Sequence, residues 1–219
     1  MKTDSCPLCM REQPIFFYQS NRVNLVRDFL QCTNCQLVFV PSRFHLSAAQ
    51  QKYRYLEHNN DPMDSGYRDF LSRLMAPLLP LLKEGDTGLD FGCGPGPALA
   101  EMLKESGYEM DLYDPLFQDN DSTLKNTYDF VTCTETIEHF IHPASDFVLL
   151  DSVVKNGGVV GIMTSILYEE VLFEDWYYKL DPTHVSFYTP STMEWISDHF
   201  NWIIKSTHKN LYFFIKQGL

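Results

Sequence analysis

Four side chains able to bind a metal or move a proton stand in two stretches of the 219-residue chain. Glu135, Glu138 and His139 follow the apolar run 128–133, and His184 lies in a later loop. Glu135 and Glu138 are three apart, so one helical turn places them on one side. Carboxylates and imidazoles suit a hard or borderline divalent ion, and an imidazole also accepts a proton near neutral pH. The four are candidate catalytic residues, as bases or metal ligands; the alternative that Glu138 and His139 only order their loop stays open.

An acid and three alternating glycines form a second candidate site: Asp90, Gly92, Gly94 and Gly96. They follow a short apolar strand and precede a predicted helix, an order that builds a ligand cradle at the helix N-terminus. Glycines let a ligand approach the backbone closely. A dinucleotide fingerprint needs glycine or alanine where Pro97 stands, so the pattern disfavours a dehydrogenase. The remaining alternative is a glycine turn that only links strand and helix.

The Asp-x-Gly-x-Gly-x-Gly pattern resembles motif I of the class I S-adenosylmethionine (SAM)-dependent methyltransferases, a resemblance that runs from about Tyr67 to the C-terminus. It implies a Rossmann-like α/β sheet with a reversed C-terminal strand, and SAM as cofactor. In that family the first acid orders the turn, and a second acid, here Asp114, holds the ribose hydroxyls. The resemblance gives as cofactor-binding residues Asp90, Gly92, Cys93, Gly94, Gly96, Asp114, Pro115, Thr134, Glu135 and Tyr67.

The Glu-x-x-Glu-His stretch with a distant histidine is similar to two methyltransferase groups, the ubiquinone-pathway O-methyltransferases and the small-RNA 2′-O-methyltransferases. In the RNA group these residues hold a metal that grips vicinal hydroxyls. The resemblance implies O-methylation of a small hydroxylated metabolite, with His139 and His184 as bases or metal ligands, and it leaves Mg²⁺ open as a cofactor. The alternatives are a non-catalytic SAM-binding scaffold that docks through its N-terminal segment, and an RNA-end methyltransferase.

Two Cys-x-x-Cys pairs stand near the N-terminus: Cys6 with Cys9, and Cys32 with Cys35. This spacing is typical of a four-thiolate zinc ribbon. Four sulfurs leave no open position on the metal, so the zinc is expected to be structural. A thioredoxin-like redox pair is the alternative, but no βαβ pattern surrounds these cysteines.

These motifs require three segments, predicted as a zinc ribbon (1–45), a helical cover or linker (46–85) and a SAM-binding core (86–219). The expected ribbon strands are 15–18 and 37–40, and the expected linker helices are Ser47–His58 and 67–82, the second kinked by Pro77 and Pro80. The core should contain strands at 108–113, 128–133 and 159–164, a helix at 143–155 ended by Asn156-Gly157-Gly158, and a closing strand pair at 202–206 and 211–215.

The segment from Pro115 to Thr127 departs from the family pattern. It is too short for the helix and third strand that the family places there. Asp119, Asn120 and Asp121 are candidates for the adenine contact, and a solvated loop explains them equally well.

Composition and charge limit the partners. Hydrophobic residues make up 44 % and charged residues 21 %, as in an ordinary globular protein. No apolar leader or membrane-length run is present, which predicts a cytoplasmic protein without membrane contact. The net charge of −12 is uneven: residues 1–58 carry +3 and residues 59–219 carry −15. A core this acidic argues against nucleic acid and for a small-molecule acceptor; the sequence leaves the oligomeric state undetermined.

Overall fold

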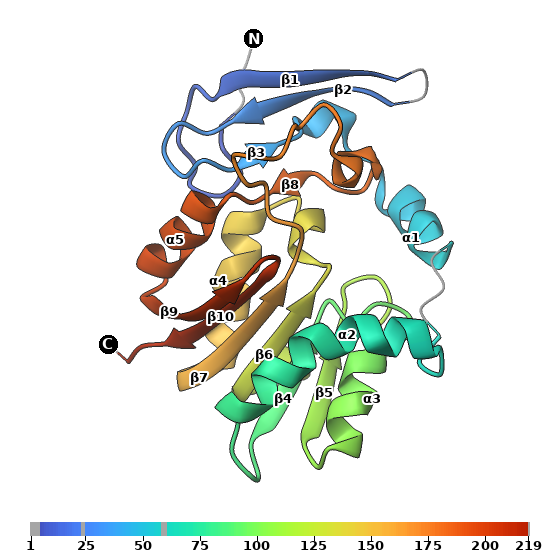
Figure 1. Cartoon of the computed structure of the whole chain (residues 1–219), viewed down its shortest axis with the longest axis vertical. Coiled ribbons are helices and arrows are strands. Elements are labelled where there is room, and N and C mark those ends of the chain that lie inside the picture. The colour runs from blue at the N-terminus through green and yellow to red at the C-terminus, as the bar shows by residue number, and fades with distance from the viewer. Residues whose placement is uncertain (1–4, 23–24, 58–60, 219) are drawn as a thin grey trace.

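The computed structural model describes residues 5–22, 25–57 and 61–218. They form a six-stranded sheet with helices on both faces and a four-stranded sheet, drawn at the top of Figure 1. None of the helices in these ranges combines the length and apolarity that crossing a bilayer would demand.

The large sheet has the strand order β5-β4-β6-β7-β10-β9. Its first four strands run parallel, and β10 runs antiparallel to both of its neighbours. This topology confirms the α/β fold with a reversed C-terminal strand. The strands are β4 (Thr87–Phe91), β5 (Glu109–Tyr113), β6 (Tyr128–Thr134), β7 (Val154–Met163), β9 (Trp202–His208) and β10 (Leu211–Lys216).

Helices cover both faces of the large sheet, which is why its central strands are nearly continuous apolar runs. On one face Leu74 and Leu103 pack with Phe130. On the other, Phe147 and Ile196 belong to a second apolar cluster. The first face carries α2 (Ser65–Leu78) and α3 (Ala98–Glu105), and the second carries α4 (Pro143–Val153) and α5 (Pro190–His199).

The predicted end of the helix at Asn156-Gly157-Gly158 is wrong. Helix α4 ends at Val153, and β7 begins at once. The pairing with β6 jumps from Tyr128↔Val154 to Phe130↔Val159, so residues 155–158 bulge within the strand. Gly157 has a φ of +81°, so this glycine serves the bulge instead of a loop.

The small sheet has the order β1-β2-β3-β8. Strands at 15–18 and 37–40 were predicted, but β2 was missed because Arg27 and Asp28 interrupt its apolar run. The fourth strand was also unexpected, because it comes from the far end of the chain, pairing Val38 with Phe187. The strands are β1 (Ile15–Arg22), β2 (Leu25–Gln31), β3 (Val38–Phe39) and β8 (Ser186–Phe187).

Between the sheets lies α1 (Ala48–Leu56). Ser47 caps its N-terminus and forms a capping box with Gln50. Its predicted end at His58 lies outside the described residues. Helix α2 starts at an Asp64 cap, contains Pro77, and continues into a 3₁₀ turn, η2 (Leu79–Leu81).

The shortened segment after β5 contains only one element in the described structure, the 3₁₀ turn η3 (Thr123–Lys125). Strand β5 is therefore the edge of the large sheet, as the length of the segment predicted.

Gly88→Ala should destabilise the protein by about 1–3 kcal/mol, because a Cβ at this position would lie 2.3 Å from Phe130 Cζ and 2.5 Å from Met110 Sδ in the packed core. Urea denaturation measures the effect. Gly66→Ala, at the exposed start of α2, is the control and should be near neutral, because a Cβ there would meet only Asp64 Oδ1, at 3.3 Å. Equal stability of the two variants would contradict this packing.

Candidate functional site

A cavity of about 1000 Å³ lies where β4, β5 and β6 end. The loops after these strands form part of its wall, and α1, α2, α4 and residues 177–184 contribute further side chains. The carboxyl ends of parallel strands are where α/β proteins bind ligands. Of the predicted cofactor residues, Asp90 and Gly96 are not in the wall. The others line it: Tyr67, Gly92, Cys93, Gly94, Asp114, Pro115, Thr134 and Glu135.

The glycine turn after β4 is clamped from two sides. Gly92 has a φ of +81°, and a Cβ here would meet Thr136 Cγ2 at 2.1 Å. Thr136 Oγ1 donates a hydrogen bond to the Gly92 carbonyl at 3.2 Å. The Gly94 amide donates to Asp114 Oδ2 at 3.0 Å. Only glycine fits at position 92, because both its backbone angle and its space exclude a side chain.

Asp114 also shapes the loop after β5. Its Oδ1 accepts hydrogen bonds from the amides of Leu116 (2.8 Å) and Phe117 (3.1 Å). Leu116 and Phe117 line the cavity, whereas Asp119, Asn120 and Asp121 do not. Beside Asp114 the cavity wall therefore carries apolar side chains, and the three polar candidates for an adenine contact lie outside it.

Asp90 lies beneath the turn and is 5 % exposed. Thr132 Oγ1 donates to its Oδ1 at 2.8 Å. Burial raises the pKa of Asp90 to about 6, against the lowering effect of the Thr132 hydrogen bond and with a contribution from the Asp114 charge. A positive charge nearby would offset this cost.

Glu135 follows β6 in a left-handed conformation, with φ +47°. Its amide donates to the Met163 carbonyl of β7 at 2.7 Å, which holds the strained residue in place. Its Oε2 lies 3.2 Å from the Tyr178 hydroxyl oxygen. Burial, and then the Glu138 charge, raise the pKa of Glu135 to about 8, although the nearby Tyr178 hydroxyl opposes the rise.

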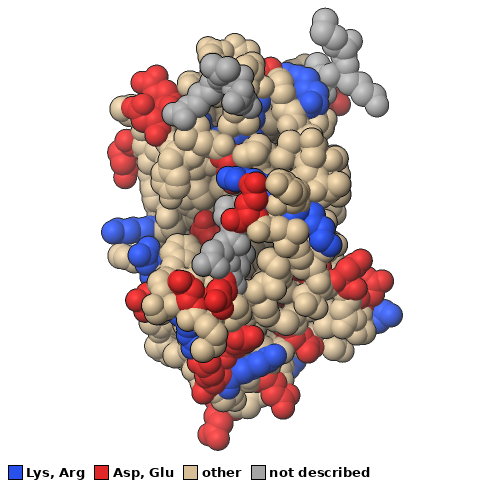
Figure 2. Space-filling view, turned by 90° about the vertical axis from the view of Figure 1, so that its right-hand side faces the viewer, with Lys and Arg blue, Asp and Glu red and all other residues tan. Residues whose placement is uncertain are grey.

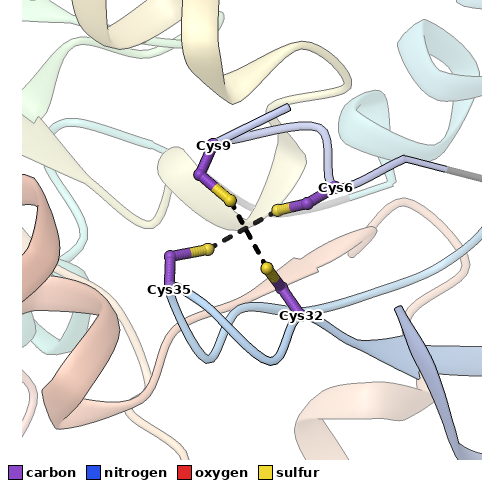
Figure 3. Close-up of side chains that lie close together, drawn as sticks. All are labelled: Cys6, Cys9, Cys32 and Cys35. Carbon is purple, nitrogen blue, oxygen red and sulfur yellow. Dashed lines mark hydrogen bonds between the residues drawn. The ribbon is translucent and has the colours of Figure 1, made fainter. Parts of the chain in front are cut away.

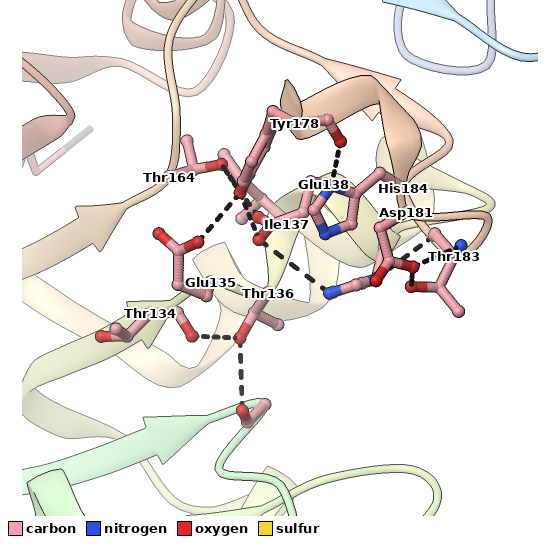
Figure 4. A network of polar contacts seen from close by, with 12 residues as sticks. Thr134, Glu135, Thr136, Ile137, Glu138, Thr164, Tyr178, Asp181, Thr183 and His184 are labelled. Atoms are coloured by element: carbon pink, nitrogen blue, oxygen red, sulfur yellow. Dashed lines mark hydrogen bonds and ion pairs between the residues drawn. The ribbon is translucent and has the colours of Figure 1, made fainter. Parts of the chain in front are cut away.

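Glu138, in the 3₁₀ turn η4 (Ile137–His139), is fully buried. Its Oε2 accepts from Thr164 Oγ1 at 2.9 Å, and its Oε1 accepts from the Tyr178 hydroxyl at 2.5 Å (Figure 4). The roles of Thr164 and Tyr178 were not predicted, because single polar residues in apolar stretches resemble ordinary packing residues in the sequence.

Two imidazoles stand beside this carboxylate. His184 Nδ1 lies 2.7 Å from the Tyr178 carbonyl, and His139 Nδ1 lies 3.2 Å from the Thr183 carbonyl. A carbonyl only accepts, so each Nδ1 carries a proton, and in the neutral imidazole Nε2 keeps a lone pair. Burial, and then the nearby His139, lower the pKa of His184 to about 4. The Glu138 and Asp181 charges and the Tyr178 carbonyl oppose this lowering without cancelling it.

One ligand atom from each of Glu138, His139 and His184 lies within 4.8 Å of the others. His139 Nε2 is 3.9 Å from Glu138 Oε1. The structure therefore brings together three of the four predicted catalytic residues. Glu135 joins them only through Tyr178, whose hydroxyl contacts both glutamates (Figure 4).

The loop that carries His184 has further partners that the sequence did not indicate. Asp181 Oδ1 accepts from the Thr183 amide at 2.9 Å, and its Oδ2 lies 3.2 Å from Arg54 Nη2 of α1. Burial raises the pKa of Asp181, but the Thr183 hydrogen bonds and the charges of His184 and Arg54 outweigh it and lower the pKa to about 2. Helix α1 also places the Tyr55 ring 5.0 Å from that of His139.

The four N-terminal cysteines converge on one point, as their spacing predicted (Figure 3). Sγ–Sγ distances are 3.5 Å for Cys6–Cys35 and 3.4 Å for Cys9–Cys32. A tetrahedral zinc site with 2.3 Å bonds has edges of about 3.8 Å, so the donor set fits zinc. The Pro7 carbonyl, within the first pair, accepts from the Ala144 amide of α4 at 3.2 Å, which ties the cluster to the large sheet's helices.

Charge is distributed as the sequence implied. Figure 2 shows carboxylates gathered over the lower part of one face, with fewer basic side chains among them. Among the described lining residues of the cavity, Arg54 is the only lysine or arginine, and it is bonded to Asp181 and Glu57.

Comparison with known proteins now adds to this geometry. The sequence model of a family described as "Methyltransferase domain" matches residues 63–206. A ubiquinone biosynthesis O-methyltransferase of Vibrio atlanticus (strain LGP32) is 33 % identical over 78 residues, 36 % of this chain. The match spans about a third of that relative's length (33 %).

Two solved structures share the fold. A SAM-dependent methyltransferase of Archaeoglobus fulgidus superimposes with a TM-score of 0.50 at 24 % identity, over 62 % of this chain and 69 % of that one. A 1,6-didemethyltoxoflavin-N1-methyltransferase of Burkholderia thailandensis, solved with 1,6-didemethyltoxoflavin and S-adenosylhomocysteine, gives 0.54 at 11 % identity, over 93 % and 100 %.

Asp90→Asn should change how stability depends on pH. The folded-state pKa of Asp90, about 6, exceeds the unfolded value of 3.8, so its contribution is fully present below the unfolded value and is lost as pH rises through 6. Asparagine lacks this loss. From pH 5 to pH 8 the variant should gain about 1 kcal/mol relative to wild type, measured by urea unfolding. A constant difference between the two proteins across this range would count against the buried acid.

Proposed function

This chain belongs to the methyltransferase domain family, and from that premise we propose that it transfers the methyl group of SAM to a hydroxyl group of a small, uncharged metabolite. The observation that carries the proposal is the pair of imidazoles, His139 and His184, whose Nδ1 atoms are bonded to carbonyls and whose Nε2 lone pairs remain beside Glu138. They line the same cavity as the glycine turn.

The cavity suits SAM because the ligand carries two positive groups, a sulfonium and an ammonium, and the cleft is acidic. Asp90, Asp114 and Glu135 surround the turn, two of them with raised pKa values. We assign the methionine end of SAM to the Gly92–Gly94 turn and the ribose to Asp114, with Tyr67 and Thr134 on the walls. Binding of the cation stabilises the ionised carboxylates.

In the transfer step, the acceptor oxygen attacks the methyl carbon in line with the C–S bond. The new O–C bond forms as the C–S pair returns to sulfur, leaving neutral S-adenosylhomocysteine. The hydroxyl proton passes to Nε2 of His139 or His184 and then to water. Positioning supplies much of the rate, and a general base typically adds about 10²–10⁴-fold.

The same three residues would also hold a divalent cation. A buried carboxylate and two imidazoles with bonded Nδ1–H groups match the donors that metals select, and Thr164 and Tyr178 would orient the carboxylate. Such an ion, Mg²⁺ or a softer one, would lower the pKa of the acceptor hydroxyl. The base and metal roles are distinguished by chelation.

The charge of the site restricts the acceptor. Glu135, Glu138 and Asp181 line the cavity, and Arg54 is already bonded to carboxylates. A phosphate gains affinity only by meeting positive groups, so a phosphorylated metabolite or an RNA end is disfavoured. An uncharged hydroxylated ring or sugar fits this lining.

His184→Ala should lower kcat by about 10²–10⁴-fold because the proton acceptor or metal ligand is lost, with SAM affinity within about twofold of wild type. Isothermal titration measures the affinity for SAM. A radiolabel transfer assay over neutral, phosphorylated and RNA acceptors, with and without EDTA, measures turnover. His208→Ala, at the exposed end of β9, is the control.

Full turnover by the His184 variant would refute the catalytic role. SAM binding without transfer to any acceptor would favour the scaffold alternative. Loss of activity with EDTA while the cysteine cluster keeps its zinc selects the metal role, and insensitivity selects the base.

We also propose that Cys6, Cys9, Cys32 and Cys35 bind one structural Zn²⁺. The purified protein should then contain a single zinc per chain, and Cys9→Ser should lose zinc and unfold the N-terminal segment, because so small a sheet has little core of its own. Metal analysis and circular dichroism test this. Cys93→Ser, outside the cluster, is the control and should retain zinc; a zinc-free wild type would refute the site.

A further inference from the structure

Arg27 is a buried cation in the middle of β2, only 2 % exposed. Its guanidinium points at the 3₁₀ turn η5 (Tyr177–Leu180) and the loop that follows it. It donates to four main-chain carbonyls of this segment. Nη1 donates to the carbonyls of Pro182 (3.3 Å) and His184 (3.0 Å). Nη2 donates to those of Lys179 (2.5 Å) and Asp181 (2.8 Å).

Such an arrangement is costly for a residue that only fills space. Burial lowers the pKa of Arg27 to about 10, although the Asp181 charge opposes this. Its Nε is buried without a hydrogen-bond partner in the described structure. Its charge faces carbonyl dipoles and the ring of Phe29, 5.1 Å away. A hydrophobic side chain would avoid this cost but would leave the four carbonyls without their donor, so the guanidinium has a role beyond packing.

The loop that Arg27 holds also orients both imidazoles. The Tyr178 carbonyl accepts from His184, and the Thr183 carbonyl accepts from His139. Along the chain, Tyr178 comes directly before the first of the four carbonyls that Arg27 bonds, and Thr183 lies between the last two. A shift of the loop would therefore move both histidines relative to Glu138.

A second set of hydrogen bonds also connects the small sheet to the site. The Val40 amide, just after β3, donates to the Val185 carbonyl at 2.9 Å, and the Val185 amide donates to the Glu138 carbonyl at 2.9 Å. The small sheet thus contacts the site through its backbone on one side and through Arg27 on the other.

We propose that Arg27 is a positioning residue for methyl transfer, whose forked guanidinium fixes the loop 179–184 so that His139 and His184 face Glu138. The inference rests on the proposed function of these histidines. Four carbonyls around one point need a planar fork with several donors, which lysine lacks, so Arg27→Lys keeps the charge and loses the geometry.

The test compares Arg27→Lys and Arg27→Met with Arg43→Lys, a conservative change at an exposed arginine in the 3₁₀ turn η1 (Ser42–Phe44), which is paired with Asp28. Nuclear magnetic resonance of ¹⁵N-histidine-labelled protein reports the ring tautomers, and isothermal titration reports affinity for S-adenosylhomocysteine. Both Arg27 variants should bind that product within about twofold of wild type, while the His184 ring loses its single Nδ1–H tautomer. With an acceptor in hand, kcat should fall at least about tenfold with KM for SAM unchanged.

Folded Arg27 variants whose histidine signals match wild type would overturn the proposal. A measurement on wild-type protein covers the case in which the variants do not fold: the Nη protons of Arg27 should exchange with solvent at least about 100-fold more slowly than those of Arg43, and equal rates would also overturn it. Neither readout uses an acceptor, so absence of methyl transfer counts against the proposed function and not against the positioning by Arg27.

Discussion

The buried carboxylate of Glu138 is the group whose requirements organise the site. An isolated charge without access to water costs several kcal/mol, so it must be surrounded by donors. Two hydroxyls supply these hydrogen bonds, that of Thr164 just beyond β7 and that of Tyr178 in η5. The Glu138 main-chain carbonyl accepts from Val185 beside β8. One acid therefore joins the large sheet, the loop over the cavity and the small sheet in a single network.

That network gives the N-terminal segment a part in the site. Strand β3 pairs with β8, the first cysteine pair contacts α4, and Arg27 bonds the loop that carries His184. The division at residues 45 and 85 stays a prediction, but these contacts cross it. A segment used only for docking would not need a buried arginine beneath the loop that carries His184. The cysteine cluster is thereby linked, through two strands, to the placement of the imidazoles.

The cofactor cleft and the acceptor end of the cavity share one electrostatic character. Asp90 and Glu135 are carboxyls whose burial raises their pKa values, and Asp114 lies between the glycine turn and the loop after β5. A sulfonium donor offsets this excess of acid, whereas its neutral product does not. Under the proposed function, the same acidity would favour SAM over a dinucleotide phosphate and disfavour anionic acceptors, so both preferences would have one physical origin.

The sequence alone determined what depends on short stretches: the glycine turn, whose position 92 admits no side chain, the paired cysteines, the closing antiparallel strands and the missing third strand. It also placed Glu138, His139 and His184 among the candidates. The partners Thr164, Tyr178, Asp181 and Arg27 came only from the tertiary structure, as did β8. Their spacing carries no periodic signal, and Arg27 meets its loop across about 150 residues. Backbone propensity acts over a few residues, so contacts between distant segments are set by how the two sheets pack.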